Sequence, residues 1–170
     1  MTAAEPGFPG TAPGSGQPTR GKVRDMPENH EIGARLGQAV ILPEILAAGF
    51  DAFEAIRMAA RDHQDRVPTL FAAFMTTANA AVDGREALTI APSLPPAGQA
   101  RPGQVLPEET GAGEAADALA VLAAALGERL RQAAVLAEVP GDQAACQQGA
   151  AAARRICELM TRGEHDARLR

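Results

Sequence analysis

Four carboxylates repeat along one predicted helix, and they are the residues of this chain best spaced for chemistry. Asp51, Glu54, Asp62 and Asp65 follow one another at intervals of three, eight and three residues. Because eleven residues make almost three whole turns of an α-helix, Asp51 lies above Asp62 and Glu54 above Asp65. One face of this helix is therefore suited to holding Mg²⁺ against the phosphates of a nucleotide.

A magnesium site of this kind needs carboxylates from a second helix as well, because Mg²⁺ prefers octahedral oxygen ligands. The neighbouring predicted helix offers Asp83, at its end, and Arg57 and Arg61 stand beside the acidic face. A solvated face carrying ion pairs, such as Arg61 with Asp65, is the favoured interpretation. We therefore assign no metal ligand, no catalytic residue and no cofactor from the sequence, and keep the four carboxylates as the metal candidates of the alternative interpretation.

The histidines and cysteines form no metal or redox motif. None of His30, His63 and His165 belongs to a Glu-x-x-His pair, and no Cys or His spacing suits zinc. His63 is expected as a polar residue near a helix end, with a general base as the alternative. Cys146 and Cys157 share a face of one predicted helix but lie about 16 Å apart along it. A disulfide needs Cα atoms within about 7 Å, so two reduced, buried thiols are expected.

The charge distribution argues against a broad nucleic-acid footprint. The net charge is −5 and no strongly basic block interrupts the chain. A small basic cluster, Arg20, Lys22 and Arg24, ends the N-terminal arm, and it leaves open a regulator that touches nucleic acid through a flexible arm. A solvated linker is the favoured interpretation of this cluster.

Composition also bears on the location of the protein. Fifteen of the sixteen cationic residues are Arg, which together with many Ala, Gly and Pro residues is typical of a GC-rich, bacterial genome. The two longest apolar segments, 39–50 and 115–126, are interrupted by charged residues and fall short of the roughly 20 residues needed to span a bilayer. No secretory signal is visible. We expect a cytoplasmic protein without membrane contact.

Apolar residues at helical spacing dominate the C-terminal half. Leu119, Leu122, Leu126 and Leu130 form one stripe along a predicted helix. The last helix presents small residues on its own stripe, with Gly149 and Ala153 next to Ile156. Small side chains let helix backbones approach closely, so we expect these seven residues to mediate helix–helix contact.

Prolines and glycines set the expected limits of the other helices. A short helix begins near Asn29 with Ile32, Leu36 and Val40 on its inner side. Further helices are expected over 43–65 and 68–83, with Gly84 as the stop of the second. The inner side of this second helix is expected to include Phe71 and Met75. The last helix follows a Pro-Gly turn, is expected to be capped by Asp142 and should end near Thr161.

The sequence thus predicts an all-α protein of four main helices and a short leading one. The expected organisation is a disordered arm (1–28), a Phe-containing helical hairpin with the leading helix (29–88), a Pro-rich connector (89–107), an Ala-rich hairpin (108–163) and a frayed tail (164–170). Whether the two hairpins pack as one four-helix bundle is left open. The leading hypothesis is an interaction or accessory protein that self-associates or binds a partner helix. The alternatives are the metal-dependent phosphate hydrolase and the nucleic-acid regulator described above.

Overall fold

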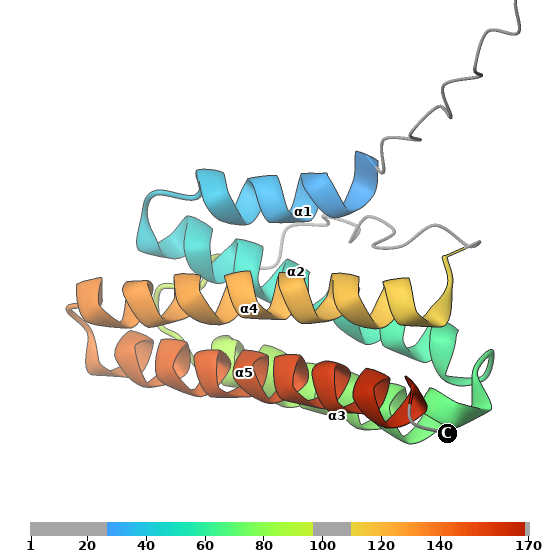
Figure 1. The fold of residues 1–170 in the computed structure, drawn as a ribbon. Coiled ribbons are helices and arrows are strands. Elements are labelled where there is room, and N and C mark those ends of the chain that lie inside the picture. Colours follow the sequence, from blue (N-terminus) through green and yellow to red (C-terminus); the bar gives the residue numbers. More distant parts are fainter. Residues whose placement is uncertain (1–26, 97–109, 169–170) are drawn as a thin grey trace, which may run out of the picture.

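The computed structural model describes residues 27–96 and 110–168, and all regular structure in these residues is helical (Figure 1). In chain order the elements are α1 (Pro27–Gln38), α2 (Leu42–Gln64), the short 3₁₀ helix η1 (Pro68–Leu70), α3 (Phe71–Thr89), α4 (Ala112–Leu136) and α5 (Pro140–Arg168). The predicted all-α class, with four main helices and a short leading one, is confirmed.

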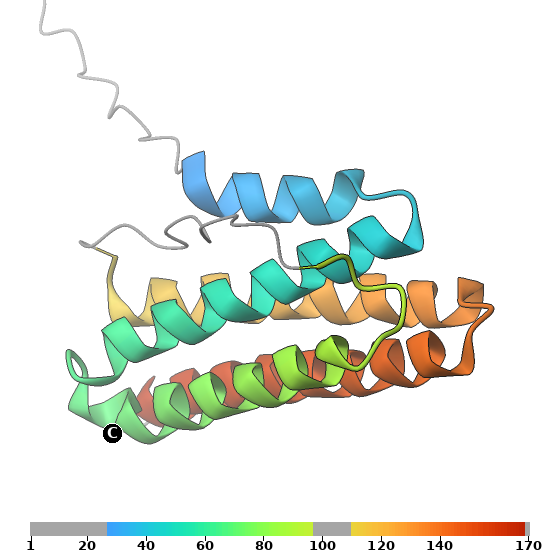
Figure 2. The same ribbon diagram turned by 180° about the vertical axis from the view of Figure 1, so that it is seen from behind.

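The four main helices form a closed ring of contacts. Helix α2 packs against α3 and α4, and α5 packs against the same two helices. Neighbouring helices in this ring run antiparallel, as both views show (Figure 1, Figure 2). The packing is consistent with a single four-helix bundle, and α1 lies on its outside against α2 and α4.

One layer of the core joins the two hairpins through glycine. A Cβ atom at Gly49 of α2 would lie 3.2 Å from Leu88 Cδ1 and 3.4 Å from Leu130 Cδ2. A Cβ atom at Gly149 of α5 would lie 3.0 Å from Leu130 Cδ1 and 3.1 Å from Leu88 Cδ2. The missing side chains of two helices therefore make room for one leucine from each of the other two. We call these four residues the glycine–leucine layer.

Helices α2 and α3 approach more closely than the sequence indicated. The predicted helix stop at Gly84 is wrong, because α3 continues through this residue to Thr89. A Cβ atom at Gly84 would lie 2.4 Å from Cε1 of Phe53, whose side chain is fully buried. Glycine is required here by the close approach of an aromatic ring rather than by a left-handed backbone.

Some other local expectations are also wrong. Val40 lies beyond the end of α1 and is 77% exposed, while the neighbouring Ala39 is buried. Phe71 and Met75, expected on the inner face, are partly exposed. Helix α5 does not stop near Thr161 but runs to Arg168, and Gly163 packs against Ala73 of α3.

The described helices include none long and apolar enough to cross a membrane. The cysteines are unpaired, as expected from their spacing. Cys146 is buried as expected, whereas Cys157 is only half-buried.

Candidate interaction surfaces and the carboxylate face of α2

The four carboxylates of α2 share one side of the helix but meet different surroundings. Asp51 and Glu54 are half-buried, whereas Asp62 and Asp65 are exposed. Asp51 faces Arg35 of α1 at 3.9 Å and lines a pocket of about 390 Å³ between α1 and α2, which Glu44 also lines. Burial raises the pKa of the Asp51 carboxyl, and the charge of Arg35 offsets only part of this rise.

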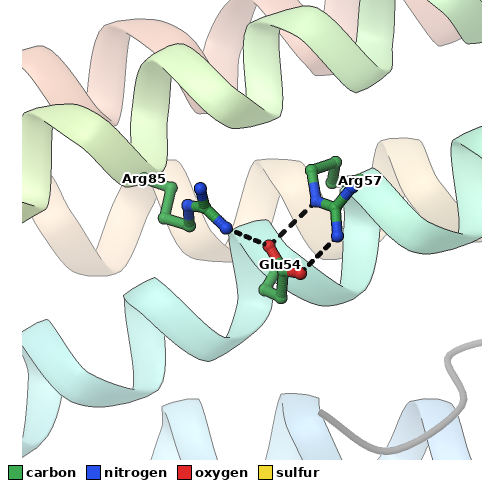
Figure 3. A network of polar contacts seen from close by, with 3 residues as sticks. All are labelled: Glu54, Arg57 and Arg85. Atoms are coloured by element: carbon green, nitrogen blue, oxygen red, sulfur yellow. Dashed lines mark hydrogen bonds and ion pairs between the residues drawn. The ribbon is translucent and has the colours of Figure 1, made fainter. Parts of the chain in front are cut away.

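Glu54 is held by two arginines, one from its own helix and one from α3 (Figure 3). Arg57 donates from Nε to Oε2 at 2.9 Å and from Nη2 to Oε1 at 2.5 Å, and Arg85 donates from Nη1 to Oε2 at 2.6 Å. The guanidinium carbon of Arg85 also lies 5.7 Å from the centre of the Phe50 ring. The two hydrogen bonds from Arg57, together with the one from Arg85, lower the pKa of Glu54 below its ordinary value of 4.5. This network ties α2 to α3.

The carboxylates do not gather as a metal site would require. Among the described residues, no group of three or more His, Cys, Asp or Glu side chains is arranged to hold a metal ion. Asp83, the acidic residue that the neighbouring helix offered, lies 3.9 Å from Arg155 of α5. The second helix therefore brings arginine, not carboxylate, to the acidic face of α2.

His63 lies near the end of α2, as expected, but its side chain is buried in the core rather than solvated. Its side chain is 3% exposed, its Nδ1 lies 3.0 Å from the carbonyl oxygen of Ala59, and its ring centre is 5.8 Å from that of Phe74. Its Nε2 atom has no hydrogen-bond partner. The imidazole lines neither the pocket between α1 and α2 nor the pocket between α4 and α5.

The seven residues predicted to mediate helix–helix contact are all buried within the chain. They are Leu119, Leu122, Leu126, Leu130, Gly149, Ala153 and Ile156. Their contacts in the structure are with other helices of the same chain, so a surface for a second molecule has to be formed by other residues. The basic arm residues Arg20, Lys22 and Arg24 lie outside the described residues.

Exposed apolar side chains gather at one end of the bundle. Both the α1–α2 connection and the α4–α5 turn lie at this end (Figure 1, Figure 2). Of the ten large apolar side chains exposed in the described part of the chain, five belong to it: Val135 (84% exposed), Val40 (77%), Leu136 (70%), Ile41 (56%) and Val139 (42%). Two exposed acidic residues, Glu44 and Glu138, are close to these five residues in the sequence. We call these five residues the apolar end.

A second surface feature is a groove of about 510 Å³ between α4 and α5, the α4–α5 groove. Small residues line it, with Ala123, Gly127 and Ala150 buried and Ala124 and Ala151 exposed. Polar and charged residues on both helices also line it: Glu128, Arg131, Gln147 and Arg154. The half-buried Cys157 completes the lining. Because the floor has no long side chains, the groove stays open along the bundle surface.

Asp142 has a role that the sequence did not reveal. Instead of capping α5, its carboxylate is fully buried and accepts hydrogen bonds from Ser93, at 2.9 Å from the backbone N and 2.7 Å from Oγ. Burial raises the pKa of the nearby Cys146 thiol to about 11, and the charge of Asp142 adds to the rise. That thiol therefore stays protonated at neutral pH and is a poor nucleophile.

Comparison of the chain with protein-family models, with curated proteins and with solved structures found no match.

Proposed function

We propose that this chain is a small helical protein–protein interaction or accessory protein that binds a partner through its apolar end. The observation that carries the proposal is that five exposed apolar side chains lie at one end of the bundle, on the α1–α2 connection, the last turn of α4 and the α4–α5 turn. Contiguous apolar surface on a folded protein is a mark of an interaction site, because covering it contributes about 25 cal/mol per Å².

The chemistry of the apolar end suits a protein surface with apolar side chains and basic neighbours. Glu44 and Glu138 add negative charge to this end, and the Glu44 carboxylate accepts a hydrogen bond from the backbone N–H of Val40 at 3.1 Å. Basic groups on the partner would pair with such acidic residues, as complementary charges at the edge of an interface do. The proposal places the protein in the cytoplasm, which agrees with its two unpaired thiols.

The test compares two positions on α4 with the same exposure. Leu136 belongs to the apolar end and Val121 lies in the body of the helix, and both are 70% exposed. A photoreactive amino acid at position 136 should form a covalent adduct with a partner in extracts of the source cells, and the same residue at position 121 should not.

A second variant checks that the adduct reflects binding. Leu136→Ser combined with Val40→Ser should lower recovery of the captured partner at least about tenfold, whereas Val121→Ser should leave it unchanged. Equal recovery with both variants, or equal adducts from both positions, would contradict the proposal.

A further inference from the structure

The α4–α5 groove is a second unpartnered surface, separate from the apolar end, and its charges are arranged across it. Glu128 stands on the α4 wall and Arg154 on the α5 wall. They lie at about the same level, because a Cβ atom at Gly127 would be 3.8 Å from the backbone N of Arg154. Glu128 and Arg154 thus place opposite charges on the two walls at matching height, with Arg131 also lining the α4 wall.

These charges are paired along their own helices rather than across the groove. The Glu128 carboxylate accepts hydrogen bonds from Arg131 and from Nε2 of Gln132, the latter at 2.9 Å, and Arg154 Nε lies 3.6 Å from Glu158. Such exposed pairs within one helix contribute only a few tenths of a kcal/mol. Both side chains can therefore turn toward a second molecule at little cost.

Antiparallel packing of α4 and α5 makes this surface self-complementary. A two-fold axis parallel to the groove would place α4 of one copy opposite α5 of the other, and these two helices would run antiparallel. Rotation about this axis does not change the height of any residue along it. Glu128 of each copy would then face Arg154 of its partner, so that one contact occurs twice. Ala124 and Ala151, exposed on the two walls, would let the backbones of the two copies approach closely.

We propose that a second copy of this chain occupies the α4–α5 groove in solution and forms a two-fold symmetric dimer. Two features favour a second copy as the occupant: the opposite charges of Glu128 and Arg154 at matching height, and the small residues that line the groove. None of the five residues of the apolar end lines the α4–α5 groove, so the inference does not rest on the partner binding proposed above.

The first experiment measures mass in solution against concentration for two matched alanine variants. Sedimentation equilibrium should show a monomer–dimer equilibrium for the wild type and for Ala72→Arg, which changes an exposed alanine on α3. Ala151→Arg fills the groove and should weaken the dimer at least about tenfold. At a concentration low enough for both variants to be monomeric, circular dichroism should show the same helix content and unfolding midpoint for both.

A charge exchange tests the two-fold arrangement itself. Glu128→Arg alone and Arg154→Glu alone should each weaken the dimer, because each places like charges opposite one another twice. Mixing the two variants should restore dimers that contain one copy of each, since every facing pair is then opposite in charge.

Three results would overturn the inference. The first is a wild type that stays monomeric up to about 1 mM, the weak limit of specific association. The second is a dimer that survives Ala151→Arg, because it would use another surface. The third is a mixture of the charge variants that remains monomeric. None of these results changes the expectation for Leu136 at the apolar end, so failure of the dimer and failure of the proposed function can be told apart.

Discussion

Single glycines decide how closely the helices of this protein approach. At Gly84 the ring of Phe53 occupies the space that a side chain would need, and at Gly49 and Gly149 leucine methyl groups do so at longer range. Flexible leucine ends can move by a few tenths of an ångström, whereas a fully buried ring in a packed core has less freedom. Gly84 is therefore the glycine of the core least able to be replaced.

Gly84→Ala should destabilise the fold by about 1–3 kcal/mol, because the new methyl group overpacks the contact with Phe53. An alanine in a helix normally stabilises relative to glycine by about 0.5–1 kcal/mol, so the sign of the change is informative. Gly33→Ala is the matched control, since nothing lies within 4 Å of its Cβ position on α1. Urea unfolding should show lower stability for the first variant and equal or higher stability for the second.

Two carboxylates one turn apart on α2 should affect stability in opposite directions. The pKa of Glu54 is lowered in the folded chain, so its contribution is present above its unfolded pKa of about 4.5 and is lost as pH falls through the folded value. The pKa of Asp51 is raised above 3.8, so its ionised form costs stability at neutral pH and this cost disappears in acid.

At neutral pH, Glu54→Gln should therefore destabilise the chain by about 1 kcal/mol, and Asp51→Asn should stabilise it slightly. Both differences should shrink toward acid pH. Urea midpoints measured across this range provide the check, with Glu86→Gln as the control for loss of one exposed negative charge. If Asp51→Asn destabilises the chain as much as Glu54→Gln does, the assigned environments are incorrect.

At the scale of elements, the segment after α3 is attached to the start of α5. Ser93 donates two hydrogen bonds to Asp142, and a Cβ atom at Gly141 would lie 3.0 Å from Cδ of Pro92. These contacts join residues separated by 49 positions and connect the two hairpins outside the helical core.

Asp142→Ala should lower the free energy of unfolding by about 1–3 kcal/mol, because the Ser93 donors lose their acceptor in a partly buried site. Amide hydrogen exchange at Ser93 should rise by a larger factor than exchange in the middle of α4. Gln143→Ala changes an exposed residue of the same turn and should leave both measurements unaltered. Unchanged exchange at Ser93 in the Asp142 variant would show that the attachment contributes nothing.

The elements were largely predictable from local signals, and the misses have a common cause. The start of α2 beside Pro43 and the break before Pro68 follow from proline chemistry, and the sequence located both. The predictions for Gly84 and Asp142 were wrong because each residue type also has a common local role, glycine as a helix stop and aspartate as a helix cap. Their actual partners, Phe53 and Ser93, are distant along the chain and become visible only when the hairpins are packed.

The candidate surfaces were less predictable than the helices, for a physical reason. Leu119 and Ile156 belong to apolar stripes, and a stripe alone does not distinguish contact within a chain from contact with another chain. The structure places the predicted contact residues inside, and leaves Val135, Leu136 and the groove alanines outside. The sequence placed the carboxylates of α2 on one face correctly. It could not show that Arg85, from another helix, forms an ion pair with Glu54 on this face.

At the scale of the whole molecule, the apolar end depends on the hairpins packing as one body, whereas the α4–α5 groove lies within one hairpin. The apolar end combines the α1–α2 connection with the α4–α5 turn, and the chain's packed core contains the seven residues that would otherwise be free to bind. The glycine–leucine layer is the contact that joins all four main helices. If the hairpins were separate, this layer would be open and the apolar end would not exist in this form.

A methyl NOE between Leu88 and Leu130 tests this packing most directly. The two leucines belong to different hairpins, and their methyl groups lie 3.1 and 3.0 Å from the same Cβ position at Gly149. In protein labelled at leucine methyl groups, with Leu88→Met used for assignment, we expect a strong cross-peak between these residues. Cross-peaks within each hairpin together with none between Leu88 and Leu130 would contradict the account.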